Sequence, residues 1–172
     1  MGSEVYYHGT PHDFEWFDLN AIGSGNDTEG PGIYFSTDLT DARSYAFPNG
    51  YVWTVRLHLR GLLPLSGPVN RRQAEQMLRE APDLVDDLTN WDENPKKAFQ
   101  IALNGMLSQG SPKEVFEQIW YDFYRRKPAL WLEKLVKFGY DGFIVGRSGQ
   151  TKHAVVFNLD SIEVVKKERY KR

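Results

Sequence analysis

Gly30-Pro31-Gly32-Ile33-Tyr34-Phe35-Ser36-Thr37 is the stretch on which the predicted fold depends. Its glycine-proline-glycine start favours a tight turn, and residues 33–35 predict a short buried strand directly after it. Tyr34 is therefore expected on rigid backbone beside a bend. A tyrosine held in this way can offer a fixed flat surface to a ligand.

A second tyrosine, Tyr45, follows 45 − 34 = 11 residues later. Asp38 or Thr40 can cap a short helix over residues 41–46, and this helix would bring Tyr45 back close to Tyr34. Two rings with a slot between them suit a flat aromatic ligand.

Composition indicates an ordinary globular protein of one domain, residues 1–172. The chain has 41% hydrophobic and 26% charged residues, a net charge of −2 and no cysteine. The charge gives no whole-molecule attraction to nucleic acid or anionic lipid, and the lack of cysteine excludes disulfides and thiolate chemistry. No apolar run approaches a membrane span and no signal-peptide pattern is present. We expect a cytoplasmic protein, or a toxin-like effector delivered without a cleaved signal.

Strand patterns occur near both ends of the chain. The first ends before the turn-like Gly9-Thr10-Pro11, which puts His8 at a strand end. In the strand predicted at 51–59, alternation of apolar and polar residues predicts one buried face, with Arg56, His58 and Arg60 on a solvated face opposite. The basic tail 166–172 is expected to be a solvated end. The predicted strands are 4–7, 33–35, 51–59, 143–145, 154–157 and 162–165.

Residues 71–138 form a predicted helical block between the strands. Apolar spacing indicates a helix around residues 74–81 and a second after Pro82. Asn94-Pro95 is a typical N-cap and first position, and Ser111 to Glu114 is a capping-box pattern. Aromatic residues at helical spacing in this block are expected in the core. The fold class is therefore α+β, with a helical insertion at about 71–138.

These residues resemble the diphtheria-toxin-like and poly-ADP-ribose-polymerase-like ADP-ribosyltransferases. The resemblance rests on His8-Gly9-Thr10, on residues 30–36, on Tyr45, and on the closing stretches 139–145 and 154–158. It implies a split, mostly antiparallel β core whose cleft binds NAD as co-substrate, with no metal. The helical block is not part of it.

The resemblance also implies roles for single residues. His8 would hydrogen-bond the adenosine ribose, Gly9 would hold the nicotinamide carboxamide through its backbone, and Tyr34 with Tyr45 would enclose the nicotinamide ring. The implied NAD-binding set is His8, Gly9, Thr10, Tyr34, Ser36 and Tyr45, and the implied catalytic set is His8, Tyr34 and His153. Electron-rich rings suit a cationic nicotinamide, and a backbone pair to its carboxamide discriminates strongly.

Other patterns have plainer explanations. His8 and His12 are four residues apart, but Pro11 prevents a helix and no acidic cluster completes a metal site. Gly23-Ser24-Gly25 is a weak phosphate-loop signal, and residues 12–29 fit a mobile lid better. Taken singly, His8 and the two tyrosines would be structural residues.

The chain departs from the family at His153, which stands where active relatives have a glutamate. That glutamate accepts a hydrogen bond from the nicotinamide ribose and stabilises positive charge in the transition state. A neutral imidazole can accept the same bond, whereas a protonated one cannot. Activity is therefore expected to weaken below about pH 6.5.

Three functions follow from this departure. The leading one is mono-ADP-ribosyl transfer from NAD to a macromolecular acceptor with release of nicotinamide; a protein acceptor is favoured by family analogy, and nucleic acid is not excluded. A catalytically silent module that binds NAD or ADP-ribose is the second. NAD glycohydrolysis, with water as the acceptor, is the third.

Overall fold

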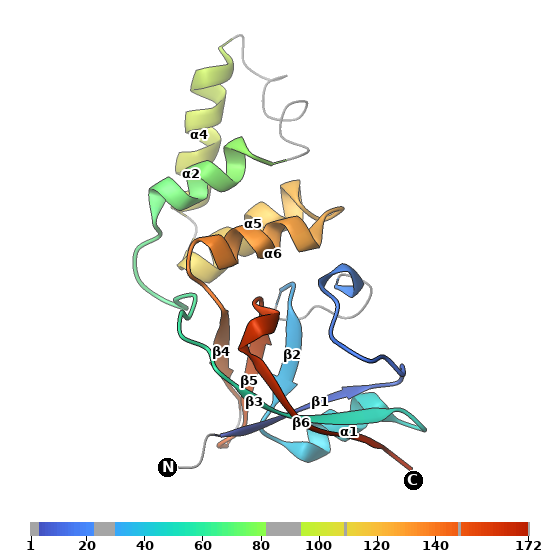
Figure 1. Cartoon of the computed structure of the whole chain (residues 1–172). Helices are drawn as coiled ribbons and strands as arrows, with labels where there is room; N and C mark the ends of the chain where they lie inside the picture. Colours follow the sequence, from blue (N-terminus) through green and yellow to red (C-terminus); the bar gives the residue numbers. More distant parts are fainter. Residues whose placement is uncertain (1–3, 23–29, 82–93, 109, 148, 172) are drawn as a thin grey trace.

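The computed structural model describes residues 4–22, 30–81, 94–108, 110–147 and 149–171. The predicted helix after Pro82, and the Gly23-Ser24-Gly25 part of the predicted lid, lie outside these residues. Figure 1 shows a sheet with helices α2, α4, α5 and α6 gathered beyond one end of it. The described elements are β1 Val5–Thr10, η1 Leu19–Ala21, β2 Ile33–Ser36, α1 Leu39–Ala46, β3 Tyr51–Leu57, α2 Arg71–Arg79, α4 Pro95–Leu107, α5 Pro112–Phe123, α6 Pro128–Lys137, β4 Gly142–Gly146, β5 Lys152–Val156, η2 Leu159–Ser161 and β6 Ile162–Arg169.

The strands form one six-stranded sheet in the order β4-β5-β2-β1-β3-β6, and every pair of neighbours is antiparallel. Strand β1 pairs with β3 over its whole length, from Val5 opposite Arg56 to Thr10 opposite Tyr51. In contrast, β1 and β2 share the single pair Tyr7 and Ser36. The sheet is therefore split into β4-β5-β2 and β1-β3-β6, which confirms the predicted α+β class with a split antiparallel core.

Each face of the sheet has its own hydrophobic core. One core joins the helices α2, α5 and α6 to Phe143 of β4, Val155 of β5 and the half-buried ring of Tyr34. The other lies on the opposite face and contains Phe35 and Trp53. Since side chains alternate along a strand, neighbouring residues of β2 contribute to different cores.

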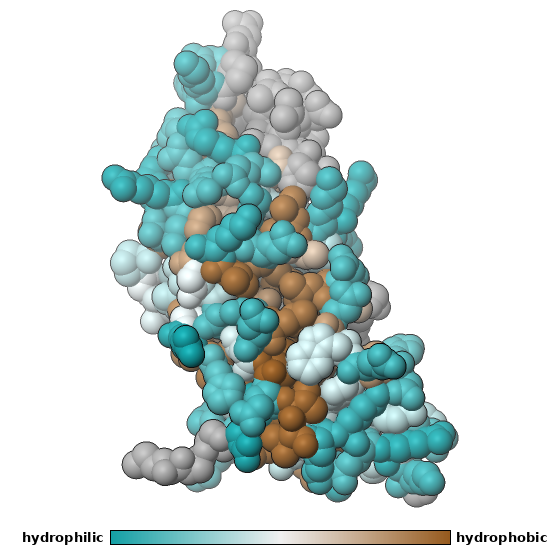
Figure 2. Space-filling view, in the orientation of Figure 1, coloured by the Kyte–Doolittle hydropathy of each residue, from teal (hydrophilic) through white to brown (hydrophobic). Residues whose placement is uncertain are grey.

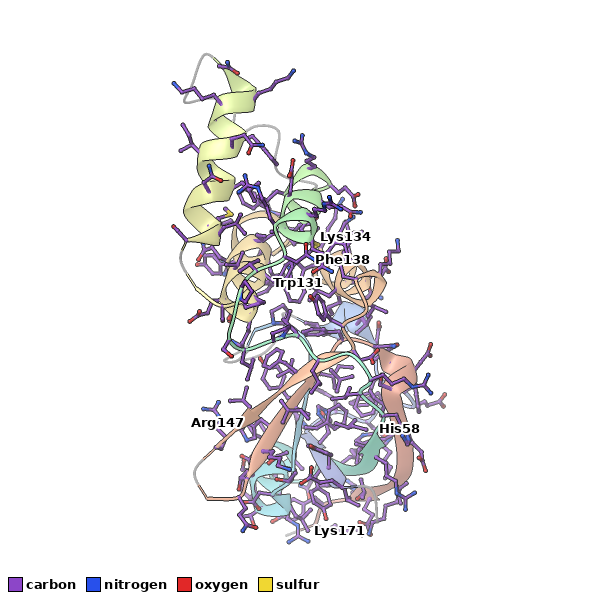
Figure 3. The ribbon with its side chains drawn as sticks, turned by 90° about the vertical axis from the view of Figure 1, so that its left-hand side faces the viewer. His58, Trp131, Lys134, Phe138, Arg147 and Lys171 are labelled. Atoms are coloured by element: carbon purple, nitrogen blue, oxygen red, sulfur yellow. The ribbon has the colours of Figure 1, made fainter. Side chains whose placement is uncertain are left out.

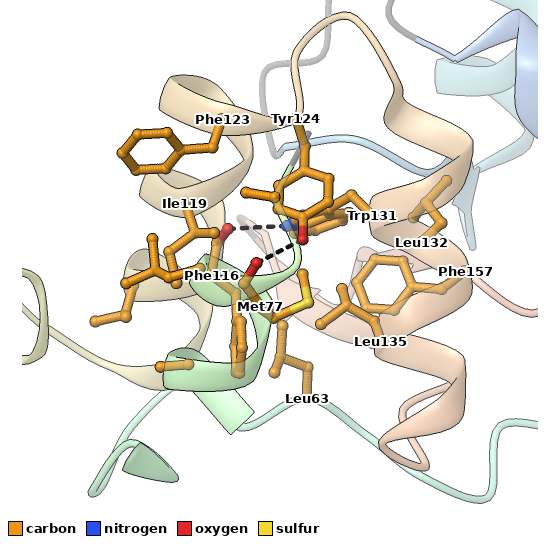
Figure 4. Close-up of a cluster of buried hydrophobic side chains, with 14 of the residues drawn as sticks. Leu63, Met77, Phe116, Ile119, Phe123, Tyr124, Trp131, Leu132, Leu135 and Phe157 are labelled. Carbon is orange, nitrogen blue, oxygen red and sulfur yellow. Dashed lines mark hydrogen bonds between the residues drawn. The ribbon is translucent and has the colours of Figure 1, made fainter. Parts of the chain in front are cut away.

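The helical insertion follows local signals in the sequence. Asn94 caps α4 through its side chain, and Ser111 with Glu114 forms the predicted capping box at the start of α5. Figure 4 shows how two buried polar side chains in this core are satisfied: the Tyr124 hydroxyl donates to the Met77 carbonyl, and the Trp131 indole donates to the Phe116 carbonyl. Burial of these large side chains therefore leaves neither polar atom unpaired.

Three strand predictions are wrong at their ends. β1 continues through Gly9 to Thr10, so His8 lies inside the strand, because pairing with β3 overrides the local turn signal. β3 ends at Leu57, and Val52 and Thr54 on its supposedly solvated face are buried. The predicted solvated tail is strand as far as Arg169, because β6 pairs with β3 along this stretch.

Of the predicted charged residues, Arg56 near the end of β3 is partly exposed and His58 just after it is exposed, and both side chains contact Glu163 of β6. Figure 2 shows one face of the molecule, on which apolar residues lie along the middle with hydrophilic residues on both sides.

Among the described helices, none combines the length and apolar character that crossing a membrane requires.

Candidate functional site

The site begins where β1 and β2 separate. Beyond the pair Tyr7 and Ser36, the His8 side chain connects the two strands, because its Nδ1 lies 2.7 Å from the backbone oxygen of Tyr34. Because a carbonyl only accepts, Nδ1 carries the proton and donates it, which leaves Nε2 as the second ring nitrogen. The ring packs against Phe17 and Phe35, on the opposite face from the Tyr34 side chain. Burial lowers the pKa of His8, against the opposing effect of the Tyr34 carbonyl.

Helix α1 lies directly on β1 at Gly9. A Cβ atom at this position would be 1.6 Å from the backbone oxygen of Ala42 and 3.2 Å from the Cβ of Tyr45. Only glycine permits this approach. The Tyr45 side chain thus starts beside the Gly9 backbone, and Tyr45 is 61% exposed. Tyr45 was predicted to lie close to Tyr34; the approach that the structure gives is to Gly9, on the neighbouring strand β1.

Tyr34 is fixed from two directions. Its hydroxyl donates a hydrogen bond to the carbonyl of Gly30, within the turn that precedes β2. Its strand approaches β5 closely, since a Cβ on Gly32 would be 2.3 Å from a methyl carbon of Val155. Tyr7 and Ser36 are an antiparallel pair, and Gly9 and Tyr34 each lie two residues from that pair along their strands. Gly9 and Tyr34 are therefore opposite each other, on the same face of the sheet as Tyr7 and Ser36. Tyr34, Gly9 and Tyr45 therefore border the gap between β1 and β2.

Two predicted binding residues have hydroxyls that serve the local backbone. Ser36 is 5% exposed and accepts a hydrogen bond from the Asp38 amide, which leads into α1. Thr10 is 6% exposed and accepts from the His12 amide at the turn after β1. In the described structure these two residues shape the ends of the strands rather than line an open surface.

His153 lies on β5 opposite Ser36, on the same face as Tyr34. Its Nε2 is 2.9 Å from Oδ2 of Asp41 in α1, and Arg147 Nε donates to its Nδ1 at 3.4 Å. In this arrangement Nε2 donates to Asp41 and Nδ1 accepts from Arg147. Arg147 follows β4. In Figure 3, Arg147 and His58 lie at opposite sides of the sheet.

Gly9, Tyr34 and Tyr45 thus border the gap, His153 lies on the same face of the neighbouring strand β5, and His8 lies on the other face. Asp41 and Arg147 are the neighbours that the sequence did not predict. Asp41 precedes Tyr45 by four residues and so lies on the same flank of α1, a signal that helical spacing could have given. Arg147 had no such signal, because it reaches His153 across the β4–β5 connection.

No group of three or more histidine and acidic side chains within the described ranges is placed to hold a metal ion. The gap is instead bordered by a backbone edge, two phenols and an imidazole. A split antiparallel sheet with these residues at its parting is the arrangement that the sequence resemblance implied for ADP-ribosyltransferases.

Comparison with known proteins agrees with this class. Residues 3–170 match the family described as ADP-ribosyltransferase in polyvalent proteins, so the chain belongs to that family. Family membership implies NAD as the co-substrate. Neither the curated proteins nor the solved structures gave a match.

Proposed function

We propose that this chain transfers a single ADP-ribose from NAD to a macromolecular acceptor and releases nicotinamide. The proposal is supported by Gly9, Tyr34 and Tyr45 beside the point where the pairing of β1 with β2 ends, with His153 on the same face of β5. Beyond Tyr7 the edge of β1 that faces β2 has no further ladder pair in the described structure. Backbone groups on such an edge can pair with a carboxamide.

The residues divide the work of binding. Tyr45, exposed on α1, and Tyr34, fixed by Gly30, supply ring faces for the nicotinamide, which is cationic while it is attached to the ribose. His8 keeps its Nδ1 on the Tyr34 carbonyl, so that Nε2 is the atom left to meet the adenosine ribose. A packed ring that is hydrogen-bonded on one side holds its other nitrogen in a fixed direction.

In the proposed reaction, the bond between the nicotinamide nitrogen and the ribose C1′ breaks with its electron pair leaving on nicotinamide. The acceptor's nucleophile attacks the resulting cationic sugar and loses its proton. His153 stabilises this cation through Nδ1, which accepts a hydrogen bond from the ribose hydroxyl. This bond replaces the 3.4 Å contact between Nδ1 and Arg147. Asp41 keeps the proton on Nε2, which is what leaves Nδ1 available as an acceptor.

The imidazole at position 153 favours a second candidate, an NAD-binding module without turnover, because a neutral ring stabilises positive charge less than a carboxylate does. Incubation with labelled NAD and candidate protein acceptors separates the two. Transferred label with free nicotinamide supports the transferase, NAD binding without nicotinamide release supports the module, and nicotinamide release that no acceptor accelerates supports hydrolysis.

We expect Tyr45→Ala to weaken NAD binding by about tenfold, since it removes one ring face from the nicotinamide. Isothermal titration calorimetry with NAD measures this. Tyr121→Ala is the matched control, because Tyr121 is also a helical tyrosine and is 55% exposed compared with 61% for Tyr45. Equal affinity of both variants would remove Tyr45 from the binding site.

A further inference from the structure

A second hollow, with a volume of about 520 Å³, lies beside α1. Its floor includes Tyr7 of β1 and Thr54 of β3, and Leu39 and Arg43 of α1 form one wall. The opposite side is formed by the end of the chain, including Lys166 of β6. We call this hollow the basic groove.

The basic groove and the NAD cleft lie on the same face of the sheet. Direct pairs run across the strands from His153 through Ser36, Tyr7 and Thr54 to Lys166. Paired residues share a face, so this row connects the two sites. Tyr7 is two strands from His153, which corresponds to roughly 10 Å.

Helix α1 separates the two sites. Leu39 and Arg43, four residues apart, border the basic groove, whereas Asp41 contacts His153. At 100° per residue, Asp41 and Tyr45 lie on the other flank of the helix from Leu39. The two sites are therefore neighbours with different linings and one shared wall.

The charges of the groove are mainly positive. Arg43, Lys166 and Lys171 line it with one acid, Glu168, which is paired with Lys166 at 2.7 Å. Arg169 also lines it, but its charge acts on Asp13, beyond the groove. The charges of Arg43, Lys166, Lys171 and Glu168 sum to +2. Since the net charge of the chain is −2, the charges of all its other residues sum to −4.

Hydroxyl groups complete the floor. Thr54 is 7% exposed, and neither its hydroxyl nor that of Tyr7 has a hydrogen-bond partner within the described residues. Hydroxyls beside cations are donors that suit an oxyanion. A carboxylate in the groove would find both kinds of group.

We propose that the basic groove docks an acidic peptide segment of the protein that receives ADP-ribose. This proposal rests on the proposed transferase function. A peptide is favoured over nucleic acid because the groove has an excess of positive charge, whereas the net charge of the residues outside it is negative and opposes the approach of a long polyanion. An extended chain covers about 3.3 Å per residue, so three or more residues span the distance from Tyr7 to the level of His153.

The test uses fluorescein-labelled peptides of ten glutamates and of ten glutamines, and a labelled twelve-residue oligothymidine, in fluorescence anisotropy titrations. The glutamate peptide should bind the wild-type chain and the glutamine peptide should not. The triple variant Arg43→Gln, Lys166→Gln, Lys171→Gln should bind the glutamate peptide about tenfold more weakly, given three partly exposed ion pairs. Raising the salt concentration should also weaken this binding.

The matched control is Lys96→Gln, Arg126→Gln, Lys127→Gln, which lowers the net charge by the same three units at exposed residues of α4 and of the α5–α6 connection. It should bind like wild type. Equal loss in both triple variants, no binding of the glutamate peptide, or tighter binding of oligothymidine would each overturn the proposal. Nicotinamide release from NAD without peptide is measured in parallel. The groove variant should keep the wild-type rate, whereas absence of NAD binding and turnover in the wild type contradicts the transferase function separately.

Discussion

His8 uses its two ring nitrogens for different purposes. Nδ1 donates to the Tyr34 carbonyl where β1 and β2 separate, and Nε2 is the nitrogen that we propose for contact with the ligand. A protonated ring would be a charge packed against Phe17 and Phe35, which is why burial lowers the pKa of His8. In the proposed function, binding of the ligand therefore depends on the protonation state of this side chain.

The pH dependence of stability follows from this lowered pKa. In the unfolded chain His8 binds a proton near its ordinary pKa of about 6.5, whereas in the folded chain it binds one only at lower pH. Its contribution to the free energy of unfolding is thus full above pH 6.5 and is lost as the pH falls towards the folded pKa. Urea unfolding between pH 7.5 and 5.5 measures it. His8→Gln should flatten the curve, and His12→Gln, at an exposed histidine, should leave it unchanged.

In the proposed reaction His153 stabilises the transition state, and its neighbour Asp41 determines which side chains at position 153 can do the same. We expect His153→Glu alone to give no gain in nicotinamide release, because the new carboxylate would face Asp41, whose Oδ2 now lies 2.9 Å from Nε2. Combining it with Asp41→Asn removes that repulsion and should raise the rate at least about tenfold above the single variant. Chromatographic measurement of nicotinamide checks this. Equal rates for the single and double variants would contradict the role of Asp41.

At the scale of elements, the contact of α1 with β1 positions Tyr45. We expect Gly9→Ala to destabilise the fold by about 1–3 kcal/mol, because its Cβ would enter the space of the Ala42 carbonyl. Gly105→Ala is the control. No atom lies within 4 Å of its new Cβ, and alanine in the middle of α4 should stabilise by about 1 kcal/mol. Urea denaturation measures both, and equal effects would show that α1 does not depend on Gly9.

The same elements explain which parts of the fold could be predicted. The caps at Asn94 and Ser111 depend on a few adjacent residues, and the helices they begin were predicted correctly. The ends of β1, β3 and β6 depend on pairing between segments about 40 to 120 residues apart, which no local pattern encodes. Gly9 and Thr10 therefore resembled a turn, and the basic end of β6 resembled a tail.

The candidate site shows the same division. The sequence order of His8, Tyr34, Tyr45 and His153 could be matched to a family, and the family is confirmed. The contacts of Asp41 and Arg147 with His153 could not be predicted, because α1 and the β4–β5 connection meet only in the folded sheet.

The whole molecule consists of two three-stranded halves, β4-β5-β2 and β1-β3-β6, that meet at Tyr7 and Ser36. The helical insertion packs on the first half, and α1 packs mainly on the second while Asp41 reaches His153 on the first. The proposed NAD site lies at this junction, so its shape depends on how the halves are held together. α1 and His8 are the described parts that connect them beside the single strand pair.

That lone pair has a mechanical consequence. Backbone bonds that are loaded side by side share a force, whereas this single pair shares it only with the His8 hydrogen bond and with α1. Under tension applied across the sheet, rupture should begin between Tyr7 and Ser36, and each half should survive it with its own ladder intact.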